Sequence, residues 1–275
     1  MKLWHQSRTD LGRLPRYAEV MAAHFARVGE PGTTVDLHGM APGTYDSDYP
    51  TADTQYSYFS YLHSLQILDN VRRAEREGYD GFLIMNLPEV VQEEAQTLVD
   101  IPVVSYAQAS MYTAAMLGRR FAIVAMIPTF IPLYESHIER YGMSSRAWGV
   151  VPLGLQHSGV FAGFDDPAPV VAAVEQRTRE LAEQGVDVII PGEAPVSAVL
   201  SLVGLTRVDP GRPAVLAPVG AGLAELAEGR RVAPGLRQDV APVSERAVAV
   251  GQALVVGPGL GGELLGGLDD AYGVG

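Results

Sequence analysis

Two polar residues, Asn86 and Glu193, follow similar apolar segments and are suited to proton chemistry. Asn86 comes directly after residues 82–85, and Glu193 comes after residues 188–191 and Gly192. A carboxyl group held out of water has a raised pKa and can act as a general acid or base near neutral pH. An amide does not exchange protons in this way, but its N–H group can donate to a developing enolate or oxyanion. The pair predicts a site with one proton-transferring wall and one hydrogen-bonding wall.

Other polar residues follow further apolar segments of the same kind. His5, Gln6 and Ser7 come after a short apolar start, and Ser105 and Tyr106 come at the end of a later segment. Ligands of open parallel sheets bind beyond the carboxyl ends of the strands, so we expect these residues at one common edge. The predicted catalytic residues are Glu193, Asn86 and His5, and the predicted substrate contacts are Gln6, Ser7, Leu87, Ser105 and Tyr106.

Each catalytic candidate also has a structural explanation, and the sequence leaves both readings open. Glu193 at a predicted helix start gains from the helix dipole without any part in catalysis. Asn86 can satisfy the amides of its own loop. His5 can be a packed polar residue or a second proton donor. A reaction with two bases would require His5 or Tyr106 to stand opposite Glu193.

Metal and cofactor sites are not indicated. His38, His63, His137 and His157 share no ligand spacing, so we predict no metal site. The run from Gly257 to Gly262 is similar to a phosphate-binding loop, but neither a following Lys-Ser or Lys-Thr pair nor a strand-to-helix context supports it. We therefore expect that the protein works without a cofactor.

Composition limits the partners and the chemistry. The 275 residues are 47% hydrophobic and 19% charged, which is typical of a globular protein. A formal net charge of −12 disfavours nucleic acids and anionic membrane surfaces, so a small molecule is the expected partner. The cysteine count of 0 excludes disulfides, thiolate metal sites and thiol nucleophiles.

The amino-terminal segment and the hydropathy pattern predict a cytoplasmic protein. The first residues lack the basic-then-apolar order of a secretory signal. A membrane-spanning helix needs roughly 18 or more consecutive apolar residues, and no run approaches that length.

Apolar segments alternate with helical periodicity along the chain, which predicts a parallel sheet flanked by helices. Residues 78–86 align without gaps with residues 185–193, and both copies read helix, Gly, any residue, Asp, apolar strand. Pro102 to Val104 resembles Pro213 to Val215 farther on. We interpret this as an internal duplication, although the pattern also recurs by chance in α/β proteins.

The duplication predicts two lobes. We assign residues 1–110 with about 215–240 to the first lobe and 111–214 to the second. Residues 241–275 form a glycine-rich tail that we expect to be loosely ordered.

Several of these segments together resemble a known family. Residues 78–106, 116–124 and 140–143 are similar to the hydantoin racemase branch of the aspartate/glutamate racemase superfamily. The resemblance covers residues 1 to about 228. It implies an α/β fold of two pseudo-symmetric lobes with parallel sheets flanked by helices, and it implies a homo-oligomer.

The sequence departs from that family at its signature positions. In the family, two cysteines at the ends of pseudo-symmetric strands face opposite sides of a substrate carbon, and here those positions have Asn86 and Glu193. The polar pair after the first cysteine reads Leu87-Pro88, and a Thr-Thr pair reads Ala125-Met126. Thiol-based racemisation is therefore excluded.

Three functions remain from this reading. The leading hypothesis is a cofactor-independent enzyme that moves a proton on a small carbonyl or carboxylate compound, racemase- or isomerase-like but without cysteine. The first alternative is a hydrolase or a lyase such as a decarboxylase, acting on a cyclic amide, lactone or malonate-like acid. The second is a non-catalytic relative that binds a small ligand.

Overall fold

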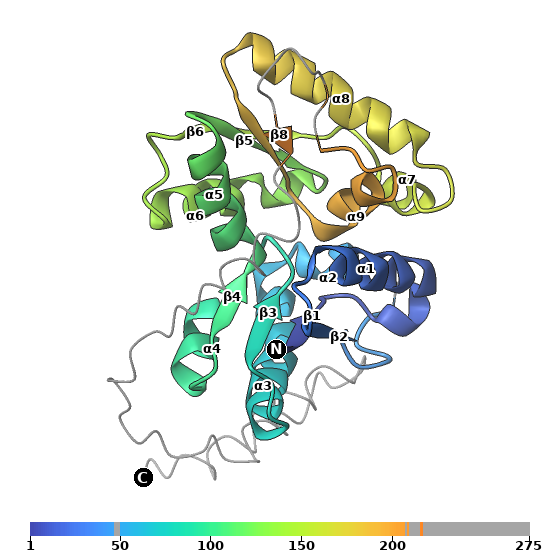
Figure 1. The fold of residues 1–275 in the computed structure, drawn as a ribbon, viewed down its shortest axis with the longest axis vertical. Coiled ribbons are helices and arrows are strands. Elements are labelled where there is room, and N and C mark those ends of the chain that lie inside the picture. The colour runs from blue at the N-terminus through green and yellow to red at the C-terminus, as the bar shows by residue number, and fades with distance from the viewer. Residues whose placement is uncertain (47–49, 207, 209–214, 217–275) are drawn as a thin grey trace, which may run out of the picture. The chain divides into compact units, whose positions relative to one another are not determined.

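Two four-stranded parallel sheets organise the chain in the computed structural model, which describes residues 1–46, 50–206, 208 and 215–216 (Figure 1). The first sheet has the order β2-β1-β3-β4 and the second the order β6-β5-β7-β8. The strands are β1 (Lys2–Gln6), β2 (Thr34–His38), β3 (Gly81–Ile84), β4 (Val103–Ser105), β5 (Phe121–Ala125), β6 (Ala147–Pro152), β7 (Val188–Pro191) and β8 (Val215–Leu216). The two sheets therefore share one topology.

Helices connect successive strands, as parallel pairing requires. They are α1 (Pro15–Val28), α2 (Thr51–Thr54), α3 (Ser57–Arg76), α4 (Gln92–Leu98), α5 (Tyr106–Leu117), α6 (Ile131–Arg140), α7 (His157–Ala162), α8 (Ala168–Glu183) and α9 (Ala194–Leu202), with short 3₁₀ turns η1 (Leu11–Arg13) and η2 (Pro128–Phe130). No helix among the described residues is both long and apolar enough to cross a bilayer.

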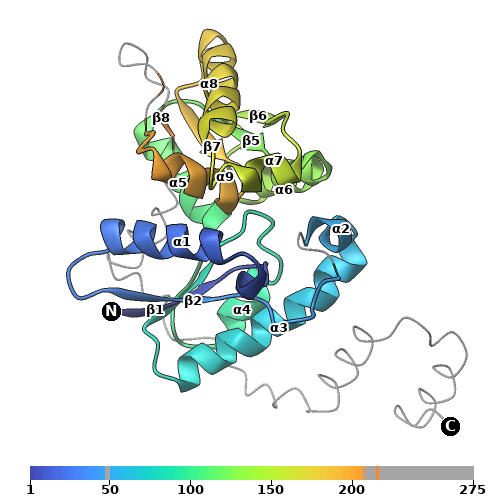
Figure 2. The ribbon, with the colours of Figure 1, turned by 90° about the vertical axis from the view of Figure 1, so that its right-hand side faces the viewer.

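Helices cover both faces of the first sheet (Figure 2). Side chains alternate between the faces of a strand. Trp4 and Phe82 accordingly pack in one cluster with Ile67 of α3, whereas Leu3 and Leu83 pack in another with Phe25 of α1. The cluster that contains Leu3 and Leu83 continues into the second sheet. This cluster therefore joins the two sheets in the described part of the chain.

Three of the central strands are buried along their whole length. All residues of β3, β5 and β7 are buried, which explains why their sequences are continuously apolar. α5, α6, α8 and α9 pack on the second sheet (Figure 1). The predicted α/β fold with two pseudo-symmetric parallel sheets is confirmed.

The repeated motif folds alike in both halves. Gly78 and Gly185 end α3 and α8 with φ of 73° and 82°, a left-handed conformation that favours glycine. The Asp80 carboxylate accepts the Lys2 N–H at 2.7 Å, and the Asp187 carboxylate accepts the Arg119 N–H at 2.8 Å. Each aspartate thus ties its strand to the start of the neighbouring strand.

The carboxyl-terminal part of the lobe assignment differs from the structure. Val215 and Leu216 pair with β7 in the second sheet, whereas the sequence reading placed residues from about 215 in the first lobe. β8 neighbours β7 in the second sheet just as β4 neighbours β3 in the first. Because the two sheets have the same strand order, this segment completes the second sheet and not the first. All described residues belong to one compact unit, Met1–Arg237. The predicted glycine-rich tail, 241–275, lies outside the described residues.

Candidate active site

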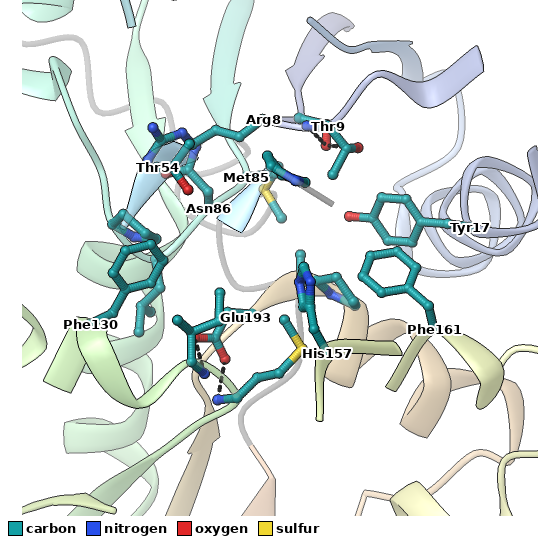
Figure 3. Close-up of a pocket in the computed structure, with 18 residues that line it drawn as sticks. Arg8, Thr9, Tyr17, Thr54, Met85, Asn86, Phe130, His157, Phe161 and Glu193 are labelled. Carbon is teal, nitrogen blue, oxygen red and sulfur yellow. Dashed lines mark hydrogen bonds between the residues drawn. The ribbon is translucent and has the colours of Figure 1, made fainter. Parts of the chain in front are cut away.

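A cavity lies beyond the carboxyl ends of the central strands of both sheets (Figure 3). It encloses about 530 Å³ of space, including its opening to solvent. Its polar lining includes Ser7, Arg8, Thr9, Asn86, His157 and Glu193, and its apolar lining includes Met85, Leu87, Met126, Phe130 and Phe161. Of the predicted site residues, the structure therefore brings Asn86, Glu193, Ser7 and Leu87 together.

Glu193 reaches away from the helix that it precedes. Glu193 stands at the N-cap position of α9, but its side chain makes no capping hydrogen bond to that helix. Instead, its carboxylate accepts the N–H groups of Met126 and Ile127 at 2.6 Å and 3.3 Å and the Tyr134 hydroxyl at 2.8 Å. Met126 and Ile127 follow β5, so the end of the neighbouring strand holds this carboxylate.

The surroundings of Glu193 suit proton transfer near neutral pH. Its residue is only 6% exposed, and burial raises the pKa of its carboxyl group to about 7 against the opposing effect of the three hydrogen bonds. A carboxylate has about four acceptor sites, and three are used. The group can therefore both accept a proton and return it at neutral pH.

Asn86 lines the cavity and has one donor without a partner among the described residues. Its Oδ1 accepts the Glu89 N–H at 3.0 Å, and because an N–H must meet an oxygen, this bond fixes the orientation of the amide. The buried Nδ2 has no hydrogen-bond partner in the described part of the chain. The structural reading of Asn86 therefore accounts for its Oδ1, and the predicted donor role concerns its Nδ2.

A strained turn keeps Asn86 in place. Glu89 and Val91 have φ of 47° and 65°, values that are costly for residues with a β-carbon. The buried Glu89 carboxylate accepts the Tyr141 hydroxyl at 2.6 Å and the Gln108 N–H at 3.0 Å. Burial raises the pKa of Glu89 to about 7. This network holds the loop that positions the Asn86 amide.

His5 and Gln6 lie outside the cavity. Both belong to β1, which extends beyond the predicted apolar start. The His5 ring is fully buried against Phe25, and burial lowers its pKa to about 3. The Gln6 Oε1 accepts from the Trp4 indole N–H at 3.1 Å. The structure therefore does not bring the predicted second proton donor to the site.

Ser105 and Tyr106 have roles in the framework. The Ser105 hydroxyl caps α5 by accepting the Gln108 N–H at 3.3 Å. The Tyr106 hydroxyl donates to the Pro191 carbonyl at 2.8 Å and lies 2.8 Å from the Ser197 hydroxyl. Neither residue lines the cavity.

Sequence reasoning missed several polar residues of the site, among them Thr9 and Thr54 and four larger side chains. Arg8 and Tyr17 line the cavity from the first half of the chain, His157 lines it from the second, and Tyr134 holds Glu193. Burial lowers the pKa of His157 to about 4, so its ring is neutral at pH 7. Arg8 directly follows the predicted residues His5 to Ser7. A prediction that ended β1 at Gln6 would have placed Arg8 among the residues beyond the strand. No sequence signal points to Tyr134.

Metal binding finds no support in the described residues, where no group of three or more His, Asp or Glu side chains is arranged as ligands.

Comparison with known proteins shows to which family the chain belongs. The sequence model of the Asp/Glu/hydantoin racemase family matches residues 16–226. The chain belongs to this family. A hydantoin racemase from Pseudomonas sp. (strain NS671) is 28% identical over 133 residues, which are 48% of this chain and 52% of the relative. A hydantoin racemase from Rhizobium meliloti is 25% identical over 48% of this chain and 54% of its own length. The chain thus spans about half the length of these curated relatives.

Solved structures agree on the fold. An allantoin racemase from Klebsiella pneumoniae superposes with a TM-score of 0.66 at 21% identity, over 83% of this chain and 86% of that chain. Within the Asp/Glu/hydantoin racemase family, this member has no cysteine at all, and Asn86 and Glu193 occupy the positions at which the resemblance implies cysteines.

Proposed function

We propose that this chain is a cofactor-independent enzyme of the racemase or isomerase type, in which Glu193 rather than a thiol transfers the proton. The observation that carries the proposal is the buried Glu193 carboxyl group, with a pKa of about 7, lining the same cavity as the unpartnered Asn86 Nδ2. In Figure 3 the two side chains lie on opposite sides of that cavity.

The proposed step is proton abstraction beside a carbonyl group. Glu193 as carboxylate removes the proton from the carbon, and the electron pair of the broken C–H bond moves onto the carbonyl oxygen. The Asn86 N–H donates to that oxygen as its charge develops. For an isomerisation, the protonated Glu193 then delivers the proton to another carbon of the delocalised enolate, which restores a carbonyl group and the carboxylate. Return of the proton to the same face of the first carbon gives isotope exchange without a change in configuration.

The position of the acidic group also supports a second candidate, a lyase. Glu193 is the single carboxyl group among the described lining residues, and His157 comes, like Glu193, from the second half of the chain. Racemisation requires protonation of the opposite face of the intermediate. Decarboxylation needs one protonation only: the C–C bond breaks, CO₂ leaves, and Glu193 protonates the resulting enolate.

Isotope exchange tests the proposal. The protein is incubated in deuterated water with a panel of hydantoins, allantoin, amino acids and substituted malonates. The first two are included because the relatives are racemases of hydantoin and allantoin. We expect one class of these compounds to react. Deuterium gained at carbon would indicate a racemase or isomerase, and loss of CO₂ with gain of one deuterium would indicate a lyase. Glu193→Gln should lower the rate at least about 100-fold with an unchanged circular dichroism spectrum. The control is Glu19→Gln on the surface of α1.

Two outcomes would overturn the proposal. One is an exchange rate in Glu193→Gln within a few-fold of wild type. The other is a complete lack of turnover across the panel while the folded protein binds a panel compound, which would favour a non-catalytic binding protein.

A further inference from the structure

Arg8 places a cation in the wall of the cavity. It follows β1, is 7% exposed, and donates through Nη2 to the Ser60 hydroxyl at 2.9 Å. Burial lowers its pKa while the hydroxyls of Tyr45 and Tyr134 oppose that effect. A guanidinium group nevertheless keeps its proton in proteins. The cavity therefore contains a fixed positive charge.

In the part of the chain that the structure describes, no carboxylate forms an ion pair with Arg8. Among the described residues, the ion pairs formed by arginine involve Arg16, Arg73, Arg140, Arg177 and Arg179, and none involves Arg8. The Glu193 carboxylate is held by its own donors at the end of β5. The hydroxyl of Ser60 satisfies one donor of the guanidinium group but does not balance its charge. A buried cation without an anionic partner is unfavourable, so the site favours an anion.

Two donor atoms near this charge lack acceptors. The Arg8 Nε and the Asn86 Nδ2 are buried and have no hydrogen-bond partner in the described part of the chain. A buried donor that makes no hydrogen bond lowers the stability of the folded protein. Arg8 and Asn86 lie on the same side of the cavity in Figure 3, across from Glu193. Both donors would be satisfied by the oxygens of one small anionic group.

The remaining lining fits an apolar body. Met85, Leu87, Phe130 and Phe161 supply apolar surface to the rest of the cavity, beside polar residues such as Thr9 and His157. The protein has a net charge of −12, so its overall field opposes the approach of anions. An anion that enters must be held by local charge, and Arg8 is the lining residue that supplies it.

We propose that Arg8 determines substrate specificity, and that the substrate is a small monoanion with an apolar substituent, its anionic oxygens bound by Arg8 and Asn86. This inference rests on the proposed function in one respect, namely that the bound anion is the molecule on which Glu193 acts. The acidic carbon then lies between the anionic group and the Glu193 wall. Arg8 and Asn86 together stabilise the charge that moves onto the oxygens when the C–H proton leaves.

Charge-matched probes test the inference without turnover. Phenylacetate and phenylacetamide have the same apolar body and differ in charge, and calorimetry measures the affinity of each for the full chain. We expect phenylacetate to bind roughly 10- to 100-fold more tightly, as charge-assisted hydrogen bonds imply. Arg8→Gln should abolish this preference, and Arg8→Lys should keep part of it because the charge remains. Arg16→Gln removes the same charge from the exposed surface of α1 and should change nothing.

The outcomes separate this inference from the proposed function. Glu193→Gln should retain the preference for phenylacetate even though it has lost isotope exchange. Equal affinities of wild type for the two probes, or an unchanged preference in Arg8→Gln, would overturn the role of Arg8 and leave the Glu193 proposal standing. If Arg8→Gln does not fold, Arg8→Lys decides: an affinity for phenylacetate equal to that of wild type contradicts the proposed oxygen contacts of the guanidinium.

Discussion

Asn86 and Glu193 are each the second residue after the third strand of their sheet, and both line the same cavity. The symmetry of the backbone therefore brings together two chemically different groups. One can exchange a proton at neutral pH, and the other can only donate a hydrogen bond. A site of this kind distinguishes the two sides of a bound molecule.

Asn86→Asp tests the donor role of the amide. The aspartate keeps an oxygen to accept the Glu89 N–H, which now lies 3.0 Å from Asn86 Oδ1, so the strained turn is retained. It loses the Nδ2 donor. We expect isotope exchange to fall about 100- to 1,000-fold, the usual cost of an oxyanion donor. Melting temperatures should show that the variant is folded, and an exchange rate near that of wild type would remove Asn86 from the mechanism.

Tyr134→Phe tests whether Glu193 is the base. The Tyr134 hydroxyl stabilises the ionised carboxylate and so lowers its pKa. Abstraction needs the carboxylate form, so kcat/KM should rise with pH through a midpoint near pH 7 in wild type. Without the hydroxyl, the midpoint should move to higher pH. Tyr112→Phe, on the half-exposed surface of α5, is the control. A midpoint that stays in place or moves to lower pH would contradict the assignment.

The sequence predicted the two walls of the site because the duplicated motif predicts where β3 and β7 end. The alignment of residues 78–86 with 185–193 places Asn86 and Glu193 at equivalent strand ends, and the structure agrees. The motif works locally: a left-handed glycine ends the helix, and an aspartate joins the strand to its neighbour. Such short-range interactions can be read from a sequence.

The amino-terminal wall could not be predicted in this way. The change from apolar to polar residues at His5 indicated a strand end, but β1 continues through Gln6. The burial of His5 and Gln6 depends on packing from α1 and α3, which is not encoded near these residues. Arg8 is more often solvated than buried in proteins, so its residue type alone gives no sign that it lines a cavity.

The raised pKa of Glu193 has a consequence for stability. The pKa is about 7 in the folded protein against 4.5 for an ordinary glutamate, so the folded state binds this proton more tightly. The associated stabilisation is complete below about pH 4.5 and is lost as pH rises through 7. At roughly 1.4 kcal/mol per pKa unit, the loss is about 3 kcal/mol.

Urea unfolding of wild type and Glu193→Gln at a series of pH values measures this loss. Glu89 has a similarly raised pKa, but it is present in both proteins and cancels in the difference. We expect wild type to lose about 3 kcal/mol relative to the variant between pH 4.5 and 8. A difference that is independent of pH would show that the Glu193 pKa is ordinary.

Tyr106→Phe tests the hydrogen bond between α5 and the end of β7. The Tyr106 hydroxyl at the start of α5 donates to the Pro191 carbonyl at the end of β7, two residues before Glu193. Its loss leaves a buried carbonyl without this donor, which costs about 1–3 kcal/mol of unfolding free energy. Because Tyr106 does not line the cavity, we expect the pH midpoint of kcat/KM to stay near 7 while urea unfolding shows the loss of stability. A shifted midpoint at unchanged stability would mean that Tyr106 affects the ionisation of the Glu193 carboxyl group, which would contradict its assignment to the framework.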